Sequence, residues 1–96
     1  MIEGLNKHFE SRVRLGVMSV LMVNELTDFK TLKETLNLTD GNLASHIAAL
    51  EKNGYILVFK EFVGKKPKTT YKATSKGKEG FTAHLNALES LLNMNK

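Results

Sequence analysis

The amino-acid sequence predicts a mainly helical α+β fold, with a two-stranded β-hairpin placed before the last of four helices. Three observations support this prediction. Apolar residues recur at helical spacing in four segments, residues 55–73 are rich in β-branched and aromatic types, and a chain of 96 residues has room for one ordinary domain. We therefore expect residues 1–96 to form a single domain around one core.

The first two helices are predicted from an apolar pattern and a capping motif. Over residues 10–25 the apolar pattern is helical but wide, so this helix should be buried on most of its circumference. The chain should turn near Asp28, and Phe29 should begin a short link. Thr31 and Glu34 fit a capping box, in which hydroxyl and carboxylate satisfy each other's backbone donors, so a short second helix should start at Thr31.

The third helix is predicted at about residues 39–53. Thr39 suits its N-cap, and Leu43, Ile47 and Leu50 recur at the spacing of one buried stripe. Gly54 can adopt the left-handed conformation that closes the last turn. Because residues 37–39 interrupt the pattern between them, the second and third helices form a helix-turn-helix.

A β-hairpin and a last helix follow. Strands are predicted at residues 55–63 and 69–73, joined by a glycine–proline turn at 64–68, so the hairpin covers about 55–73. The last helix covers about 75–93 and can be capped by Thr74 or Ser75. Its apolar positions repeat every four or three residues, as in a coiled-coil seam, and predict a dimerisation helix: Phe81, Leu85, Leu88 and Leu92.

This order of elements is the layout of a winged helix-turn-helix, in which one helix enters the major groove of DNA and the hairpin is the wing. The charge distribution agrees with it. Residues 60–78 contain seven lysines and one glutamate, a local net charge of +6 in a chain whose net charge is +4. One basic strip on an otherwise mildly acidic chain is typical of a phosphate-backbone contact.

Composition argues against several other classes of protein. The chain has no cysteine, which excludes disulfides and thiolate metal sites and suits the reducing cytoplasm. No apolar run is long enough to span a bilayer, so we expect no membrane contact. We expect neither an enzyme nor a cofactor, because the sequence has no paired carboxylates, no phosphate-binding loop and no nucleophile at a useful spacing from a histidine.

The sequence resembles the short, single-domain winged-helix transcriptional regulators of the MarR and ArsR type. Two stretches carry the resemblance: T-D-G-N-L-A-S-H-I-A-A-L-E-K-N-G-Y-I at 39–56 and Y-K-A-T-S-K-G-K-E-G-F at 71–81. The resemblance implies that the first is the recognition helix running into the wing, and that the second runs from the wing into the dimerisation helix. It implies sequence-specific binding of double-stranded DNA by a homodimer that regulates transcription, as a repressor.

The chain also departs from that family. It lacks the cysteine motif of the thiolate metal sensors and the longer helical scaffold in which larger MarR-type proteins hold a phenolic ligand. No small-molecule effector is therefore assigned.

The candidate site residues form two groups. DNA contacts are expected on the exposed face of the recognition helix and at the wing tip, from Thr39, Asn42, Ser45, His46, Lys65, Lys66 and Lys68. Dimer contacts are expected from apolar residues of the last helix and the N-terminal segment: Leu5, Phe9, Phe81, Leu85, Leu88 and Leu92.

Two alternative interpretations stay open at this point. The recognition helix has few arginines or lysines, which favours a module that binds a protein partner through the same fold. His8 and His84 lie near the two ends of the chain and could meet across a dimer as a metal or pH-sensitive site, although no third ligand lies at helical spacing.

Overall fold

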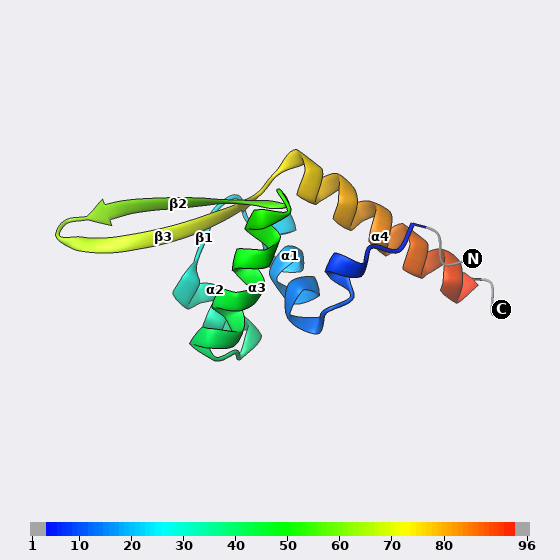
Figure 1. Cartoon of the computed structure of the whole chain (residues 1–96), viewed down its shortest axis with the longest axis horizontal. Helices are drawn as coiled ribbons and strands as arrows, with labels where there is room; N and C mark the ends of the chain where they lie inside the picture. Colours follow the sequence, from blue (N-terminus) through cyan, green and yellow to red (C-terminus); the bar gives the residue numbers. More distant parts are fainter. Residues whose placement is uncertain (1–3, 94–96) are drawn as a thin grey trace.

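A computed structural model describes residues 4–93 and confirms the predicted winged helix-turn-helix (Figure 1). The elements in chain order are η1 (Lys7–Phe9), α1 (Arg12–Val23), β1 (Thr27–Asp28), α2 (Phe29–Leu36), α3 (Asp40–Lys52), β2 (Ile56–Val63), β3 (Lys66–Ala73) and α4 (Ser75–Asn93). The β2–β3 hairpin and α4 extend from the body in opposite directions, so the molecule is long, with extents of 55 × 25 × 21 Å. Between residues 4 and 93 no helix is long and apolar enough to cross a membrane.

The sheet contains a third strand that the sequence did not predict. β1 pairs antiparallel with β3, with Thr27 opposite Tyr71 and Asp28 opposite Thr70, and the strand order is β1-β3-β2. Two residues are too few to show an alternating pattern, so only pairing with a strand distant in sequence defines β1. This pairing anchors the base of the wing to the helix-turn-helix.

The start of α2 also differs from the prediction. Asp28 is the N-cap, and its carboxylate accepts a hydrogen bond from the Thr31 amide at 2.7 Å. Pairing in β1 holds Asp28 in the extended conformation that an N-cap needs, so the helix begins at Phe29. The predictions of a capping box at Thr31 and Glu34 and of a link at Phe29 are therefore wrong.

The Asp28 cap should contribute measurably to stability. We expect Asp28→Ala to lower the free energy of unfolding in urea by about 1 kcal/mol at neutral pH, as for other N-caps. Hydrogen bonds from the Thr31 side chain and amide hold the pKa of Asp28 below its ordinary value of 3.8. The stabilisation is therefore complete above that value and is lost as the pH falls through the lower folded pKa, so wild type and variant should converge in strong acid. Asp28→Ser keeps an acceptor and is the control, and an equal loss in both variants would contradict a capping role.

The turn of the wing is tighter than predicted. β2 and β3 pair as far as Val63 opposite Lys66, so only Gly64 and Lys65 form the turn. Gly64 has a φ of +66°, the positive value that a two-residue hairpin turn with glycine first requires. Pro67, which was expected in the turn, lies in β3, where it is tolerated because β1 does not extend that far and leaves this part of β3 with one strand neighbour.

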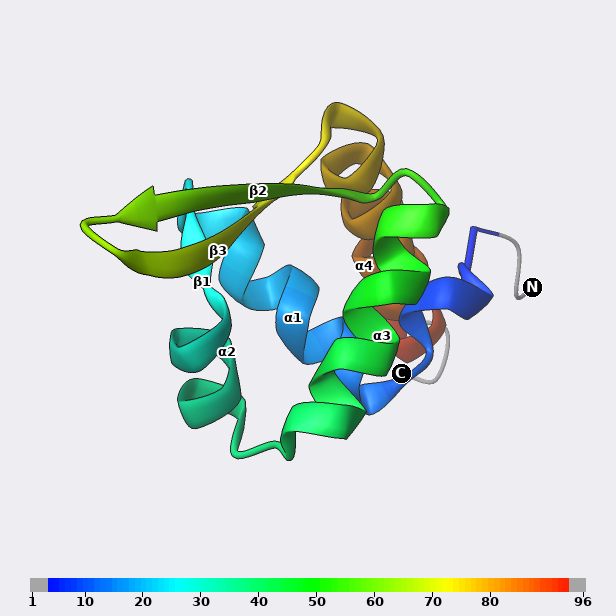
Figure 2. The same ribbon diagram turned by 60° about the vertical axis from the view of Figure 1, so that its left-hand side comes forward.

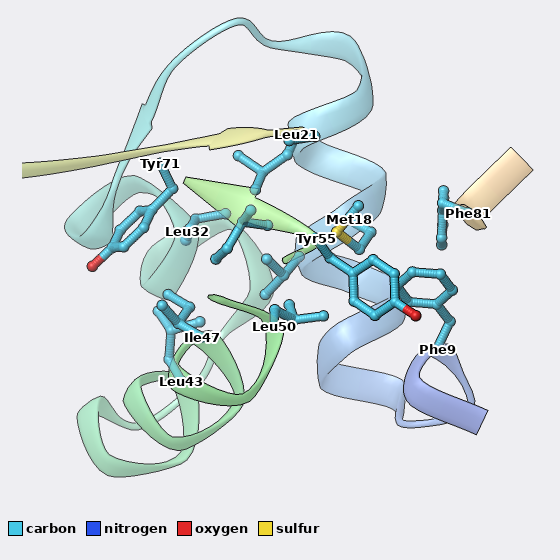
Figure 3. Close-up of a cluster of buried hydrophobic side chains, with 13 residues drawn as sticks. Phe9, Met18, Leu21, Leu32, Leu43, Ile47, Leu50, Tyr55, Tyr71 and Phe81 are labelled. Carbon is cyan, nitrogen blue, oxygen red and sulfur yellow. The ribbon is translucent and has the colours of Figure 1, made fainter. Parts of the chain in front are cut away.

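The core lies between the helices and the sheet. α3 packs beside α1 and against β2, with the hairpin running above (Figure 2). The stripe predicted for α3, Leu43, Ile47 and Leu50, is buried and points into this core (Figure 3).

A cluster of aromatic rings closes the end of the core next to α4 (Figure 3). The Phe9 ring centroid lies 4.8 Å from that of Tyr55 and 5.5 Å from that of Phe81. Phe9 and Phe81 are each 1% exposed within one chain. Their expected place in a dimer interface is therefore wrong, because rings of the same chain already cover them.

Candidate nucleic-acid interface

α3 presents small side chains to solvent. Gly41, Ala44, Ser45 and Ala48 are exposed, and nothing lies within 4 Å of the position that a Cβ would take at Gly41. The backbone of α3 can therefore approach another surface closely. A helix with this profile fits the major groove of B-DNA, which is about 12 Å wide.

The N-terminal end of α3 is fixed against α2. Asn37 ends α2 in the left-handed conformation, with a φ of 53°, and begins the turn. Lys33 Nζ lies 2.7 Å from Asp40 Oδ1 across that turn. The Thr39 hydroxyl oxygen accepts the Asn42 amide at 3.2 Å, which confirms Thr39 as the N-cap.

The C-terminal end of α3 is fixed against α4. Lys76 Nζ donates to the Asn53 carbonyl oxygen, and the Thr74 hydroxyl donates to the Gly54 carbonyl oxygen, each at 2.7 Å. The Lys76 ammonium also lies 5.0 Å from the centroid of the Tyr55 ring. Gly54 has a φ of +79°, as predicted for the residue that closes α3. These contacts set the direction of α3 relative to α4.

The predicted DNA-contacting residues of α3 have two different environments. Thr39, Asn42 and Ser45 are exposed, whereas His46 is half-buried and its Nδ1 accepts a hydrogen bond from Arg14 Nε of α1 at 3.0 Å. Burial first, and the positive charge of Arg14 second, lower the pKa of His46 below its ordinary value of 6.5. The ring is therefore neutral near pH 7. Sequence reasoning missed Arg14, because its partner lies on another helix and nothing beside it in the sequence marks it.

The wing carries the second group of predicted contacts. Lys65, Lys66 and Lys68 are all exposed, and alternation along β3 places Lys66 and Lys68 on the same face. The tip lies far from α3, so the two groups form separate contact regions (Figure 1). At the base of the wing, Lys72 Nζ lies 3.5 Å from Glu25 Oε1, and farther along the hairpin Lys68 lies opposite Glu61 in the register of β2 and β3.

The apolar stripe of α4 continues beyond the body that covers its first turns. Phe81 and His84 are buried, but Leu85 is 43% exposed and Leu92 is 70% exposed. Leu5 and Leu88 are half-buried. Of the predicted dimer residues, Leu85 and Leu92 therefore leave the most apolar surface uncovered in a single chain.

The proposed pairing of His8 and His84 across a dimer is excluded. His84 is 2% exposed, and its Nδ1 accepts the Asn6 amide of the same chain at 3.0 Å. The His8 ring packs against Tyr55, with centroids 5.6 Å apart. Within residues 4–93 no three histidine, aspartate or glutamate side chains are close enough to hold a metal ion.

A groove of about 700 Å³ lies between α1, α2 and the base of the wing. No residue of α3 lines it.

A helix that exposes small side chains, is held at both ends and lies next to the base of a basic hairpin defines a winged-helix DNA-binding protein rather than an enzyme. The chain belongs to the family of winged helix DNA-binding domains, whose model matches residues 13–92. It is 39% identical over 79 residues to an uncharacterized protein of Methanocaldococcus jannaschii, covering 82% of this chain and 86% of that one.

Solved structures have the same fold. A transcriptional regulator homologue from Pyrococcus horikoshii OT3 is similar with a TM-score of 0.86 and 31% identity, over 93% of this chain and 88% of that one. The fold is shared with MepR of S. aureus, solved as a complex with DNA, with a TM-score of 0.77 and 10% identity over 97% of this chain and 76% of that one. The predicted membership among winged-helix regulators is confirmed.

Proposed function

We propose that the protein binds double-stranded DNA sequence-specifically as a homodimer and represses transcription from the promoters that it occupies. The observation that carries the proposal is that the exposed face of α3 carries small side chains and that a basic hairpin projects from the same body. α3 enters the major groove, where Asn42, Ser45 and His46 form hydrogen bonds with base edges. Thr39 then lies close to the sugar-phosphate backbone of the DNA. The wing lysines bind phosphates and set the register.

The homodimer is supported by the uncovered part of α4. Leu85 and Leu92 continue the stripe that Phe81 begins, and a second α4 related by a two-fold axis would cover them. Leu5 and Leu88, which are half-buried, would border this contact. Since α3 is hydrogen-bonded to the start of α4, a dimer through α4 would fix the spacing of the two recognition helices, which should match half-sites about 34 Å apart.

Repression is proposed because it requires only that the protein occupy its DNA site. A dimer that covers adjacent half-sites keeps other proteins off the same stretch of DNA. Transcription in vitro from a promoter that overlaps the selected site should fall as the protein is added, and a rise would make the protein an activator.

The first test is the binding of purified protein to a pool of random duplexes at low and moderate salt, followed by selection of the tightest binders. We expect salt-sensitive binding and enrichment of a palindromic site, with sedimentation showing a dimer that Leu85→Ser with Leu92→Ser converts to monomer. Salt-sensitive binding without enrichment of any sequence would mean that the protein binds DNA only non-specifically, and it would contradict the sequence-specific part of the proposal. If no duplex binds even at low salt, the proposal is wrong and a protein partner becomes the better interpretation of the exposed face of α3.

A further inference from the structure

We propose that Arg14 fixes His46 in the tautomer that carries its proton on Nε2, so that His46 selects a base with acceptor atoms in the major groove, guanine above all. The inference rests on the proposed function and deepens it, because it names a base contact and the residue of α1 that positions it. His46 would touch DNA, and Arg14 would be a positioning residue.

The tautomer follows from the chemistry of the pair. Arg14 Nε lies 3.0 Å from His46 Nδ1. A guanidinium group has only donors and keeps its charge at any pH that a protein meets, so Nδ1 must be the acceptor. A neutral imidazole with an unprotonated Nδ1 carries its proton on Nε2. The burial that lowers the pKa of His46 keeps this neutral form dominant near pH 7.

The position of the ring makes this donor useful for reading sequence. Asn42 precedes His46 by one helical turn, so both side chains lie on the same flank of α3, beside the small exposed residues that permit close approach. His46 is half-buried and held from α1, so its ring has little freedom to turn and offer an acceptor instead. A single fixed donor fits guanine, which presents O6 and N7 together, and is mismatched with cytosine, which presents a donor.

The tautomer can be tested without DNA. Long-range ¹H–¹⁵N correlation spectra of the folded protein at neutral pH should show the His46 proton on Nε2. Arg14→Met, which keeps an aliphatic stem but has no donor, should give a mixture of tautomers, and Arg14→Lys should restore the wild-type pattern. A proton on Nδ1 in the wild type would overturn the proposal.

The base preference is tested by repeating the duplex selection with variants. We expect Arg14→Met and His46→Ala to lose the same guanine preference, by roughly tenfold in relative affinity. Arg14→Lys should keep the preference, and so should Arg12→Met, the matched control at an exposed arginine of the same helix that has no bond to His46. Undiminished guanine preference in Arg14→Met would overturn the inference while leaving the proposed function intact. If the wild type selects no sequence at all, the proposed function and the base contact both fail, and the spectra still decide whether Arg14 sets the tautomer.

Discussion

Gly77→Ala should destabilise the protein by about 3 kcal/mol, at the upper end of what overpacking usually costs. Gly77 is buried in the first turns of α4, and a Cβ there would overlap the carbonyl oxygen of Tyr55. That oxygen belongs to the backbone and accepts the Thr74 amide at 3.0 Å, so it cannot move aside as a flexible side chain would. The strain falls on the contacts that fix the end of α3 to α4.

Thermal unfolding followed by circular dichroism measures this loss. For a domain of this size, about 3 kcal/mol corresponds to a fall in Tm of roughly 12 to 24 °C. Gly41→Ala is the control, because a Cβ at that position meets nothing within 4 Å, and there alanine should raise stability by up to about 1 kcal/mol through helix propensity. A Tm for Gly77→Ala equal to that of the wild type would show that α4 can shift away from Tyr55 at no cost.

Replacing Lys65, Lys66 and Lys68 together by alanine should weaken DNA binding by about two to three orders of magnitude at 0.1 M salt. If each lysine neutralises one phosphate, the slope of log affinity against log salt should become shallower by roughly 2.7. The loss should be similar for every duplex sequence, because phosphates carry no base information. Fluorescence anisotropy over a range of salt concentrations measures both quantities.

The control for the wing variant removes positive charge elsewhere. Lys7→Ala changes an exposed residue of η1, outside the basic strip at 60–78, and it should alter the slope per lysine far less. Equal changes per lysine in the two variants would mean that net charge, rather than the position of the wing, drives binding. An unchanged slope in the wing variant would remove the wing from the interface.

Much of the candidate site was predictable because its signals are local. The Thr39 cap, the apolar stripe of α3 and the closing glycine at Gly54 depend on residues within one or two turns of each other, and all three are present in the structure. The same holds for α4, which covers Ser75–Asn93 as its spacing predicted. The pair formed by Arg14 and His46 had no such signal, because the two residues meet only when α1 packs beside α3.

The sequence alone was sufficient for the order of helices and hairpin, the class of protein and the basic strip, since periodicity, capping and charge are read within short segments. Tertiary packing decided which side chains are buried and which strands pair. Phe81 fits the helical pattern expected of an interface and Phe9 is an apolar residue of the N-terminal segment, but their rings pack edge to face against each other in the folded chain. Likewise Asp28 rather than Thr31 caps the start of α2, because pairing of β1 with β3 sets the Asp28 backbone before the helix starts. Burial and strand pairing depend on which surfaces meet, and residues far apart in the chain determine that together.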